Sequence, residues 1–240
     1  MINGKRVIAI VPARAGSKGL PGKNLRHMCG KPLIAWSISQ GLACSYVDQV
    51  LVSTDSEEIA GVATIHGARV PFLRPAELAS DGASSVDVLM HAIDYLSNIG
   101  ETYDYLVLLE PTSPLRDVAD IAGALELMDS TVAFKSVVGV AKVESAHPAF
   151  LFTERGGFLE PMLGAQPTDL RRQDIKKDYY FLEGSIYAST IASLRKTRSF
   201  YHSATTPWVV DRFKAIEIDE LSDFIMAQAL MQAKLDGVLT

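Results

Sequence analysis

The sequence predicts a three-layer α/β fold, in which a mostly parallel sheet lies between helices on both faces. Two observations carry this prediction. Short runs rich in Val, Ile and Leu, which are typical of buried parallel strands, recur along the chain. Segments with apolar residues at helical spacing separate these runs, so strand and helix alternate. The 240 residues, 48% of them apolar, are enough for one substantial core.

The first half of the chain alternates regularly between strands and helices. We expect strands at residues 6–11, 49–54, 69–72 and 105–109. We expect helices at residues 31–45, 55–66, 84–97 and 117–129. Pro32 suits the first position of the first helix, and Asp55 suits the N-cap of the second. Gly67 suits the C-cap of that second helix.

The second half of the chain interrupts this alternation once. Residues 142–183 are rich in turn residues, charges and aromatics, and we expect them to form an irregular excursion from the sheet. Around it we expect strands at 136–141, 185–189 and 214–219, and helices at 190–197 and 221–235. Ser222 lies near the predicted start of the last helix. No linker divides the chain, so residues 1–240 are predicted to form one domain.

The charge of the chain is unevenly distributed. Residues 1–47 contain seven Lys or Arg and no Asp or Glu, whereas the remainder contains 16 Lys or Arg and 28 Asp or Glu. An acidic protein with one basic segment is unsuited to general nucleic-acid binding, but it suits one small anionic ligand. The alternative is an ordinary charged surface.

Several classes of protein are excluded by what the sequence lacks. No apolar run approaches the roughly 18 residues of a membrane span, and the N-terminal apolar run is too short for a signal peptide. We therefore expect a soluble cytoplasmic protein with no membrane partner. Cys29 and Cys44 form no CxxC motif, and the five histidines have no metal-ligand spacing. Neither a zinc site nor a disulfide framework is therefore indicated. The nucleophile motif GxSxG is also absent, so no covalent intermediate on a serine is indicated.

The segment "AIVPARAGSKGLPGKNL", residues 9–25, has the composition of a phosphate-binding loop. Three glycines follow the first predicted strand, and Arg14, Lys18 and Lys23 lie among them. Glycine lets backbone N–H groups approach an anion, and the cations neutralise its charge. The spacing fits neither GxxxxGK[ST] nor GxGxxG, so an ATPase loop and a dinucleotide fingerprint are not indicated. The alternative is a surface loop without a ligand.

The segment "IEID", residues 216–219, predicts a pair of carboxylates on one side of a strand. Residues two apart in a strand share a face, so Glu217 and Asp219 would lie together, opposite Ile216 and Ile218. Such carboxylates suit Mg²⁺, which bridges phosphate oxygens and keeps several waters. The alternative is two acids on the exposed face of an edge strand.

The segment "PARAGSKGLPGKNL" resembles the N-terminal signature of the acylneuraminate cytidylyltransferases, the CMP-sialic acid synthetases and their relatives. Further blocks resemble that family in the same order: "VLVSTDSEEIA", "FLRPAELASDGASSVDV", "LLEPTSPLRD" and "AIEIDELSDF". The resemblance covers most of residues 6–225 and is weakest between 142 and 183. It implies a Rossmann-like nucleotidyltransferase fold. It also implies transfer of CMP from CTP to a 2-keto sugar acid, with Mg²⁺ or Mn²⁺ and release of pyrophosphate.

The resemblance also implies roles for individual residues. Those expected to line the CTP are Ala13, Arg14, Ser17, Lys18, Lys23, Asn24, Arg74, Ala83 and Ser85. Arg14, Lys23 and Asp219 would be the catalytic residues, and Asp219 and Glu217 would bind the metal. Considered without the resemblance, Arg74 also fits a surface salt bridge, and Ser85 also fits a helix N-cap.

The sugar site and the assembly follow from the same resemblance. Glu110, Arg172 and Gln173 are predicted to bind the sugar acid, with Arg172 on its carboxylate. The family commonly has Gln where this chain has Glu110, and Asp where it has Glu217. The excursion at 142–183 forms the dimer contact in the family, so a homodimer is expected. Aromatic residues in it are candidates for that contact or for ordinary core: Phe150, Phe152, Tyr179, Tyr180 and Phe181.

Two alternatives to this function stay open, one because Glu110 leaves the identity of the sugar acid undecided and the other because both Glu110 and Glu217 depart from the family pattern. One is a cytidylyltransferase for another sugar acid, such as Kdo. The other is a nucleotide-sugar-binding relative that has lost catalysis.

Overall fold

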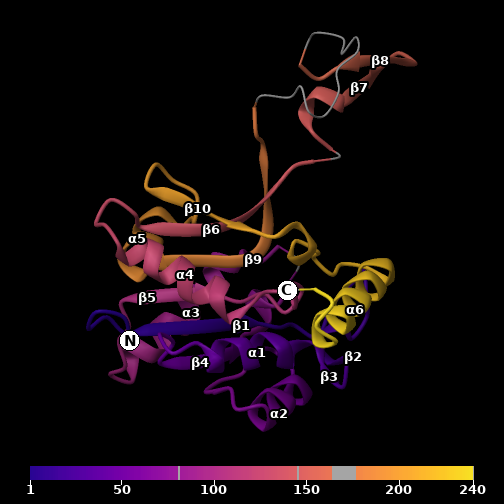
Figure 1. Ribbon diagram of the computed structural model, residues 1–240. Helices are drawn as coiled ribbons and strands as arrows, with labels where there is room; N and C mark the ends of the chain where they lie inside the picture. Colours follow the sequence, from indigo (N-terminus) through magenta and orange to yellow (C-terminus); the bar gives the residue numbers. More distant parts are fainter. Residues whose placement is uncertain (81, 145, 164–176, 240) are drawn as a thin grey trace.

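A mixed six-stranded sheet forms the centre of the protein (Figure 1). The computed structural model describes residues 1–80, 82–144, 146–163 and 177–239. The strands lie in the order β10-β6-β9-β5-β1-β4, and β9 is antiparallel to both of its neighbours while the other pairs are parallel. Their bounds are β1 Val7–Pro12, β4 Gln49–Ser53, β5 Tyr105–Leu108, β6 Ser136–Lys142, β9 Tyr180–Thr190 and β10 Thr205–Val210. The predicted mostly parallel sheet is confirmed.

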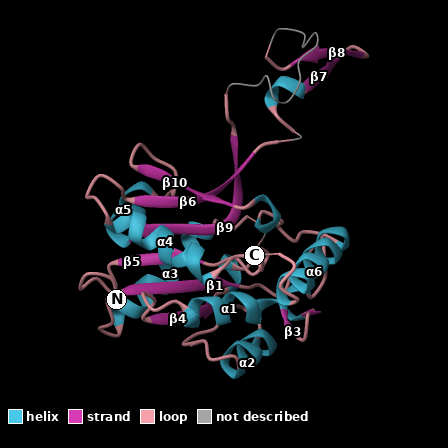
Figure 2. Cartoon of the chain, in the orientation of Figure 1, coloured by secondary structure: helices cyan, strands magenta, loops and turns pink. Residues whose placement is uncertain are grey.

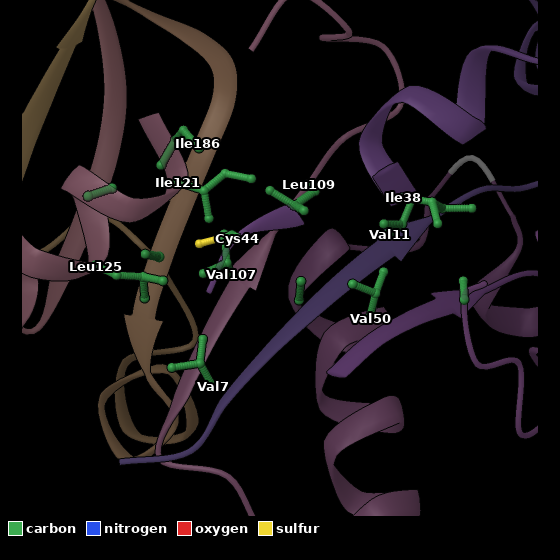
Figure 3. Packing of buried hydrophobic residues seen from close by; sticks show 14 of the residues in the cluster. Val7, Val11, Ile38, Cys44, Val50, Val107, Leu109, Ile121, Leu125 and Ile186 are labelled. Carbon is green, nitrogen blue, oxygen red and sulfur yellow. The ribbon is translucent and has the colours of Figure 1, made fainter. Parts of the chain in front are cut away.

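Helices cover both faces of this sheet (Figure 2). They are α1 Leu33–Ala43, α2 Glu57–Ile65, α3 Ser85–Asn98, α4 Val118–Asp129, α5 Ile191–Thr197 and α6 Leu221–Leu235. Alternate residues of β1 point to opposite faces. Val7 and Val11 pack with Ile38 of α1 and Ile121 of α4 (Figure 3). Ile8 and Ile10 of β1 pack with α3 and α5 in a second cluster, so the predicted three layers are confirmed.

A third apolar cluster joins α6 to the N-terminal loop. Leu20, Met28, Ile218 and Phe224 are buried in it. Two short strands, β2 His27–Met28 and β3 Lys31–Pro32, form a small separate ladder next to this cluster. The cluster therefore packs the glycine-rich loop against the segment that contains the two predicted carboxylates.

Two predicted strands are wrong, and one strand of the central sheet was missed. Residues 69–72 contain a single isolated bridge, from Arg69 to Leu51 of β4, and residues 214–219 form the last residue of a 3-10 turn followed by a loop. The missed strand is β10, whose sequence "TTPWVV" contains Pro207. Proline cannot donate to a ladder, which weakens a strand prediction, but it is tolerated here because β10 is an edge strand.

Three predicted helix starts are displaced by one or two residues. Ser56, not Asp55, caps α2, because its hydroxyl accepts a hydrogen bond from the N–H of Ile59 at 3.3 Å. Pro32 is the N-cap of α1 rather than its first helical residue. Glu220, not Ser222, precedes α6 and shares a capping box with Asp223.

The predicted excursion contains a small antiparallel ladder that projects away from the sheet (Figure 1). Its strands are β7 Phe152–Arg155 and β8 Phe158–Pro161, preceded by the 3-10 turn Pro148–Phe150. The chain returns at Tyr180, where the first residues of β9 pair with the last residues of β6. We call residues 146–163 and 177–182 the arm.

Within residues 1–80, 82–144, 146–163 and 177–239, the remaining short elements are the 3-10 turns Lys23–Leu25, Ala76–Leu78 and Arg212–Lys214. In the part of the chain that the structure describes, no helix has the length and apolar content that crossing a bilayer requires.

Candidate active site

Three adjoining cavities open at the carboxyl ends of β1 and β5. The chain passes from β1 to β4 on one side and later places β5 on the other side. In open α/β sheets, ligands bind outside the strand ends at such a reversal. The cavities have volumes of about 420, 240 and 330 Å³, and we call them the loop, Arg74 and aromatic cavities respectively.

The loop cavity brings the basic loop opposite three carboxylates. Five of the residues predicted to line CTP contribute to its wall: Arg14, Ser17, Lys18, Lys23 and Asn24. Glu110, Glu217 and Asp219 contribute the acidic side. The cavity therefore combines cations that suit phosphates with oxygen ligands that suit a divalent cation.

Two glycines determine the course of the loop. A Cβ on Gly19 would lie 2.4 Å from the carbonyl oxygen of Asp219, so only glycine permits this approach. Gly22 has a φ of +66° and precedes the turn that contains Lys23 and Asn24. The buried Asn24 amide donates to the carbonyl of Arg14 at 3.1 Å, which holds the loop in place.

Lys23 links the loop to the acidic segment. Its Nζ donates to the carbonyl of Ile218 at 2.8 Å and lies 3.3 Å from Oδ1 of Asp219. The side chain of Asp219 is 77% exposed, so it remains accessible to a ligand in the cavity. A phosphate bound here would therefore meet a cation that is already positioned by backbone contacts.

Glu217 and Asp219 line the same cavity although their segment is not a strand. The buried Ile218 between them donates its N–H to the carbonyl of Thr112 at 2.9 Å, and this bond fixes the alternation. Burial, and then the charge of Asp219, raise the pKa of the Glu217 carboxyl above its ordinary value. A divalent cation between the two carboxylates would relieve this repulsion, so the pair fits a metal.

Glu110 lines the same cavity, but among the described residues no three or more His, Cys, Asp or Glu side chains are grouped so that they could hold a metal ion. Mg²⁺ is often held by one or two carboxylates, with substrate phosphates and water completing its shell. The pair therefore matches a cation that arrives with a nucleotide.

The Arg74 cavity contains a buried guanidinium with unused hydrogen-bonding capacity. The side chain of Arg74 is 4% exposed, and neither Nε nor Nη2 has a hydrogen-bond partner. Its nearest carboxylate, Asp55, lies 3.7 Å away and accepts instead from the N–H of Ala15. Burial lowers the pKa of Arg74 below its ordinary value, against the effect of Asp55. The alternative for Arg74 is therefore wrong about the location: Arg74 forms a long ion pair with Asp55, but the guanidinium is buried rather than on the surface.

Ala83 and Ser85 line the Arg74 cavity, whereas Ala13 does not. Ser84, rather than Ser85, caps α3, so the alternative cap role for Ser85 is also wrong. Ala13 is buried, and its N–H donates to the carbonyl of Ser53 at 3.0 Å. Ala13 therefore anchors the start of the basic loop to the end of β4 rather than lining the cavity.

The aromatic cavity was not predicted from the sequence. Tyr187 of β9 and Phe200 and Tyr201 after α5 form one wall, and Leu108 and Val86 contribute to the rest. Arg198, which has a φ of +53°, lies at this cavity and forms an ion pair with Asp87 of α3. The sequence contains the run "RSFY" directly after the predicted helix at 190–197. This run alone does not show that its aromatic side chains line a cavity.

Glu110 lines all three cavities, at the end of β5. Burial, and then the charge of Glu217, raise the pKa of Glu110 to about 7. Glu110, which was predicted to bind the sugar acid, lies between the loop cavity and the aromatic wall.

Arg116 holds the backbone of Glu110 and was missed by sequence reasoning. It is fully buried, and its Nη2 donates to the Glu110 carbonyl at 3.0 Å. Its Nη1 donates to Ser37 and Gln40 of α1 at 3.2 and 3.0 Å. Arg116 therefore positions the end of β5 against α1. The predicted sugar-binding residues Arg172 and Gln173 lie outside the described residues.

The fold and these cavities define a nucleotide-binding α/β protein with a site suited to a phosphate-bound metal. Among solved structures, the chain is similar to a CMP:2-keto-3-deoxy-manno-octonic acid synthetase complexed with CTP. That likeness has a TM-score of 0.69 at 20% identity and covers 95% of this chain and 99% of the other. A 4-diphosphocytidyl-2C-methyl-D-erythritol synthase from Anaerococcus prevotii matches with a TM-score of 0.64 at 9% identity, over 96% and 100% of the two chains. At these identities the likeness shows the fold, and it confirms the predicted nucleotidyltransferase architecture.

Sequence comparison then identifies the family. Residues 8–155 match the cytidylyltransferase family. The chain is 35% identical to the CMP-N,N'-diacetyllegionaminic acid synthase of Legionella pneumophila, over 98% of this chain and 100% of that protein. It is 32% identical to the pseudaminic acid cytidylyltransferase of Campylobacter jejuni, over 93% and 95% of the two chains. The chain therefore belongs to the cytidylyltransferase family, and it is a nucleotidyltransferase.

The N-acylneuraminate cytidylyltransferase of Escherichia coli is 31% identical over 95% of this chain, but this match covers 53% of that protein. The chain thus spans about half the length of this relative. The predicted family resemblance is confirmed.

Proposed function

We propose that this protein transfers CMP from CTP to a nonulosonic acid, a sialic-acid-like 2-keto sugar acid, and releases pyrophosphate. The observation that carries the proposal is the adjacency of the loop cavity and the Arg74 cavity, which share Pro12 and Arg14. One cavity suits a triphosphate and the other suits a base, so a nucleotide spans both. The relatives that match along their whole length are named for CMP transfer to such acids or for cytidylyl transfer.

The base of CTP fits the Arg74 cavity. Cytosine presents a carbonyl oxygen and a ring nitrogen that accept hydrogen bonds, and the unmatched nitrogens of Arg74 are donors. Pairing them removes the cost of a buried unsatisfied cation. Ser85 and Ala83 complete the wall on this side, with Ser85 offering a hydroxyl. The triphosphate then extends toward Arg14, Ser17, Lys18, Lys23 and Asn24 in the loop cavity.

Asp219 and Glu217 would hold Mg²⁺, or Mn²⁺ in its place. When bound, the cation neutralises phosphate charge and orients the triphosphate. Asp219 is more exposed and already faces the loop, whereas Glu217 is longer and partly buried beside Thr112. We assign Asp219 the closer contact.

The chain's own residues contribute positioning and charge neutralisation. The anomeric hydroxyl of the acid attacks the α-phosphorus and gives up its proton to water, a new O–P bond forms, and the bond to pyrophosphate breaks. Arg14 and Lys23 neutralise the negative charge on the phosphates as it shifts toward the leaving group. Lys23 needs little reorganisation because Ile218 already orients its ammonium. Within the described part of the chain, no Ser–His or Cys–His pair lines these cavities, and the proposed transfer needs no covalent intermediate.

The acceptor acid fits the aromatic cavity, which adjoins the nucleotide cavities at Glu110 and Ser85. Arg172 and Gln173 are proposed to reach its carboxylate. We also propose that the protein is a homodimer joined through the arm, whose exposed apolar side chains have no cover in the described chain: Phe152, Phe158, Leu159, Met162 and Leu163.

The test is pyrophosphate release with CTP, Mg²⁺ and a panel of 2-keto sugar acids. We expect release with N,N'-diacetyllegionaminic, pseudaminic or N-acylneuraminic acid. Release with Kdo alone would replace the proposed acceptor class with the octonic acid. CTP binding without release with any acid would support a nucleotide-sugar-binding relative and overturn the proposal. The Asp219→Ala variant serves as the control for release that does not depend on this site.

A further inference from the structure

A buried carboxyl that the proposed transfer does not use lies at the base of the arm. Glu183 of β9 is 2% exposed, and its Oε1 accepts a hydrogen bond from the hydroxyl of Ser185. Its Oε2 has no hydrogen-bond partner within the described chain. Burial raises the pKa of the Glu183 carboxyl above its ordinary value, against the bonds from Ser185 and the charge of Arg116. Burying this group costs stability, which is typical of residues that serve a functional site.

Strand β9 is distorted where Glu183 enters the sheet. The pairing of β9 with β6 shifts register between Val138 and Val140, so Gly139 alone faces residues 183–186. We call residues 183–186 the bulge. A bulge bends its strand and redirects the residues within it, and bulges are common next to active sites.

The Glu183 carboxyl fills the space that Gly139 leaves open. A Cβ on Gly139 would lie 1.9 Å from Oε1 of Glu183, so the carboxyl takes the place of a side chain on β6. Ser185 holds this carboxyl from within the bulge. The carbonyl of Ser185 in turn accepts a hydrogen bond from Nε of the buried Arg116. The carboxyl thus fastens the bulge to β6, and Arg116 fastens it to the segment after β5.

The other side of the bulge contacts the predicted metal site. Gly184 has a φ of +77°, and a Cβ on it would lie 3.3 Å from Oε2 of Glu217 and from Oγ of Ser113. Gly184 is buried and does not line the loop cavity, so it contacts Glu217 from the interior. The hydrogen bond that Glu217 accepts from Thr112 is long, at 3.5 Å. The backbone of Gly184 is therefore a principal support for the position of the Glu217 carboxyl.

Glu217 needs a support because Asp219 repels it. Both carboxylates line the loop cavity, and their like charges drive them apart when no cation lies between them. A carboxylate that is already held in position needs less rearrangement when it binds a cation, so the residues behind it affect the metal affinity.

We propose that Glu183 is a positioning residue for the metal site: its carboxyl fastens the bulge to β6, and the bulge holds the Glu217 carboxyl where it can bind the cation together with Asp219. Glu183 itself lines none of the three cavities and touches neither the cation nor the substrates. The inference rests on the proposed function, since it assumes that Glu217 and Asp219 bind the metal.

The experiment compares Glu183→Ala, which removes the carboxyl, with Glu183→Gln, which keeps an oxygen that accepts from Ser185. The matched control is Asp129→Asn, because Asp129 is also a buried carboxyl but pairs with Lys5, before β1 and away from the carboxyl ends of the strands. The first readout is the dissociation constant of Mn²⁺ from the protein–CTP complex, measured by water-proton relaxation without an acceptor acid. The second is the Mg²⁺ concentration for half-maximal pyrophosphate release. Calorimetric titration with CTP in EDTA gives the nucleotide affinity without metal.

We expect both metal constants to rise about tenfold in Glu183→Ala and to stay within about twofold in Glu183→Gln. The CTP dissociation constant in EDTA should stay within about twofold in both variants, because Glu183 lines neither nucleotide cavity. A merely structural role would lower the melting temperature, as in Asp129→Asn, and leave the metal constants unchanged. Unchanged metal constants in Glu183→Ala would overturn the inference, as would an equal loss in Glu183→Gln.

A double variant tests whether Glu183 acts through Glu217. In the Glu217→Gln background, adding Glu183→Ala should change the metal constants by no more than about twofold, because the carboxylate to be positioned is already gone. A further rise of about tenfold there would show another route and would contradict the inference.

Gly139→Ala keeps the proposal testable if Glu183→Ala does not fold. Its Cβ displaces the Glu183 carboxyl without removing it, and we expect the same metal constants to rise about threefold. A folded Gly139→Ala variant with unchanged constants would exclude the positioning role.

The failure of this inference is distinguishable from that of the proposed function. An unaltered protein that binds no Mn²⁺ together with CTP overturns the metal assignment and this inference with it. Normal metal binding by the unaltered protein, with unchanged constants in the variants, overturns only the role of Glu183.

Discussion

Arg74 combines an energetic disadvantage in the empty protein with a use in the occupied one. A cation that is 4% exposed, with two unmatched nitrogens and a carboxylate only at 3.7 Å, destabilises the fold. Functional sites commonly contain such groups, because their donors are reserved for the ligand. The same residue should therefore lower stability and raise nucleotide affinity.

We therefore expect Arg74→Met to lower the affinity for CTP without lowering the stability of the nucleotide-free protein. We expect at least a tenfold loss of CTP affinity, because charged hydrogen bonds to the base disappear. The free energy of unfolding without nucleotide should stay equal or rise. Calorimetric titration with CTP and urea unfolding measure the two quantities. Arg69→Met is the control, since Arg69 donates to Glu101 at 2.6 Å and lies outside the three cavities. A destabilised Arg74→Met variant with normal CTP affinity would contradict the assignment.

Asp219 is the residue on which the metal assignment depends most. Replacing it with Asn removes a charge while keeping the shape, so the site binds a divalent cation less tightly. We expect the Mg²⁺ concentration for half-maximal pyrophosphate release to rise at least tenfold, with a smaller rise for Glu217→Gln. Glu57→Gln, in the first turn of α2, is the charge-matched control. A Mg²⁺ titration that coincides with that of the unaltered protein would remove Asp219 from the metal site.

At the scale of elements, the glycine-rich loop and the acidic segment form one packed unit. Gly19 lies directly against the carbonyl of Asp219, and Leu20 is buried in the same cluster as Ile218. Lys23 bonds to that segment from the loop side. The positions of the cations and of the carboxylates are therefore coupled through backbone contacts.

This coupling predicts that Gly19→Ala impairs turnover more than folding. The added Cβ would lie 2.4 Å from a backbone oxygen, so the loop or the acidic segment has to shift. Small misplacements in a transferase site lower the rate strongly, and we expect kcat to fall about a hundredfold. The melting temperature should change by only a few degrees. Gly61→Ala is the control, since no atom lies within 4 Å of its added Cβ. An unchanged kcat would contradict the coupling.

The acidic segment is also anchored from its other end, by Lys214. This buried ammonium lies 2.8 Å from Asp117 and 3.0 Å from Asp120, at the start of α4. Asp117 also pairs with Lys234 of α6. Burial opposes ionisation of Asp117, but the hydrogen bonds from Lys214 and Lys234 outweigh it and lower the pKa of this carboxyl.

The lowered pKa of Asp117 determines how its contribution to the free energy of unfolding changes with pH. A carboxyl with a depressed folded pKa contributes stability above its unfolded value of about 3.9, and this contribution is lost as the pH falls through the folded pKa. We expect Asp117→Asn to lower the free energy of unfolding by about 1–2 kcal/mol at pH 7, after allowing for its partial exposure. The difference from the unaltered protein should shrink below pH 4. Urea unfolding across this range measures it, and a constant difference would exclude the linkage.

The elements that sequence patterns predicted are those with strong local signals. β1 and β5 are uninterrupted apolar runs, and α3 and α4 have clear caps and helical spacing. β10 was missed because Pro207 is tolerated only through its edge position, which is a tertiary property. Residues 214–219 alternate like a strand, but the burial of Lys214 among acids and a single bond to Thr112 hold them as a loop.

The site residues also divide into those that a local sequence pattern predicts and those that depend on tertiary contacts. The basic loop is one continuous stretch of sequence and the acid pair is another. In each stretch the charged residue types themselves indicate the ligand that they suit. Arg116 resembles any surface arginine in sequence, and its burial depends on Ser37 and Gln40 from a distant helix. The aromatic cavity is assembled from α3, β5, β9 and the segment after α5, so no single stretch indicates it.

At the scale of the whole molecule, the arm is the part that the rest of the fold leaves uncovered. Its ladder has only two strands, and every residue from Phe152 to Glu160 is exposed. Isolated two-stranded hairpins are marginal in water. Phe150 and Tyr179 pack on the buried His147 at its base, whereas Phe152, Tyr180 and Phe181 are exposed. None of these five aromatics is fully buried, so the alternative of ordinary core does not hold for them.

A second copy of the chain would supply the surface that the ladder lacks, and this predicts the effect of Phe158→Asp. Phe158 is 76% exposed and begins β8. A charge there would be buried at an interface without a partner, so we expect the dimer dissociation constant to rise at least a hundredfold. Sedimentation equilibrium of the unaltered and variant proteins measures it. Val132→Asp is the control, because Val132 is a single exposed apolar residue, 86% accessible, between α4 and β6. An unaltered protein that stays monomeric at tens of micromolar, or a Phe158→Asp variant with an unchanged dissociation constant, would show that the arm serves another purpose than self-association.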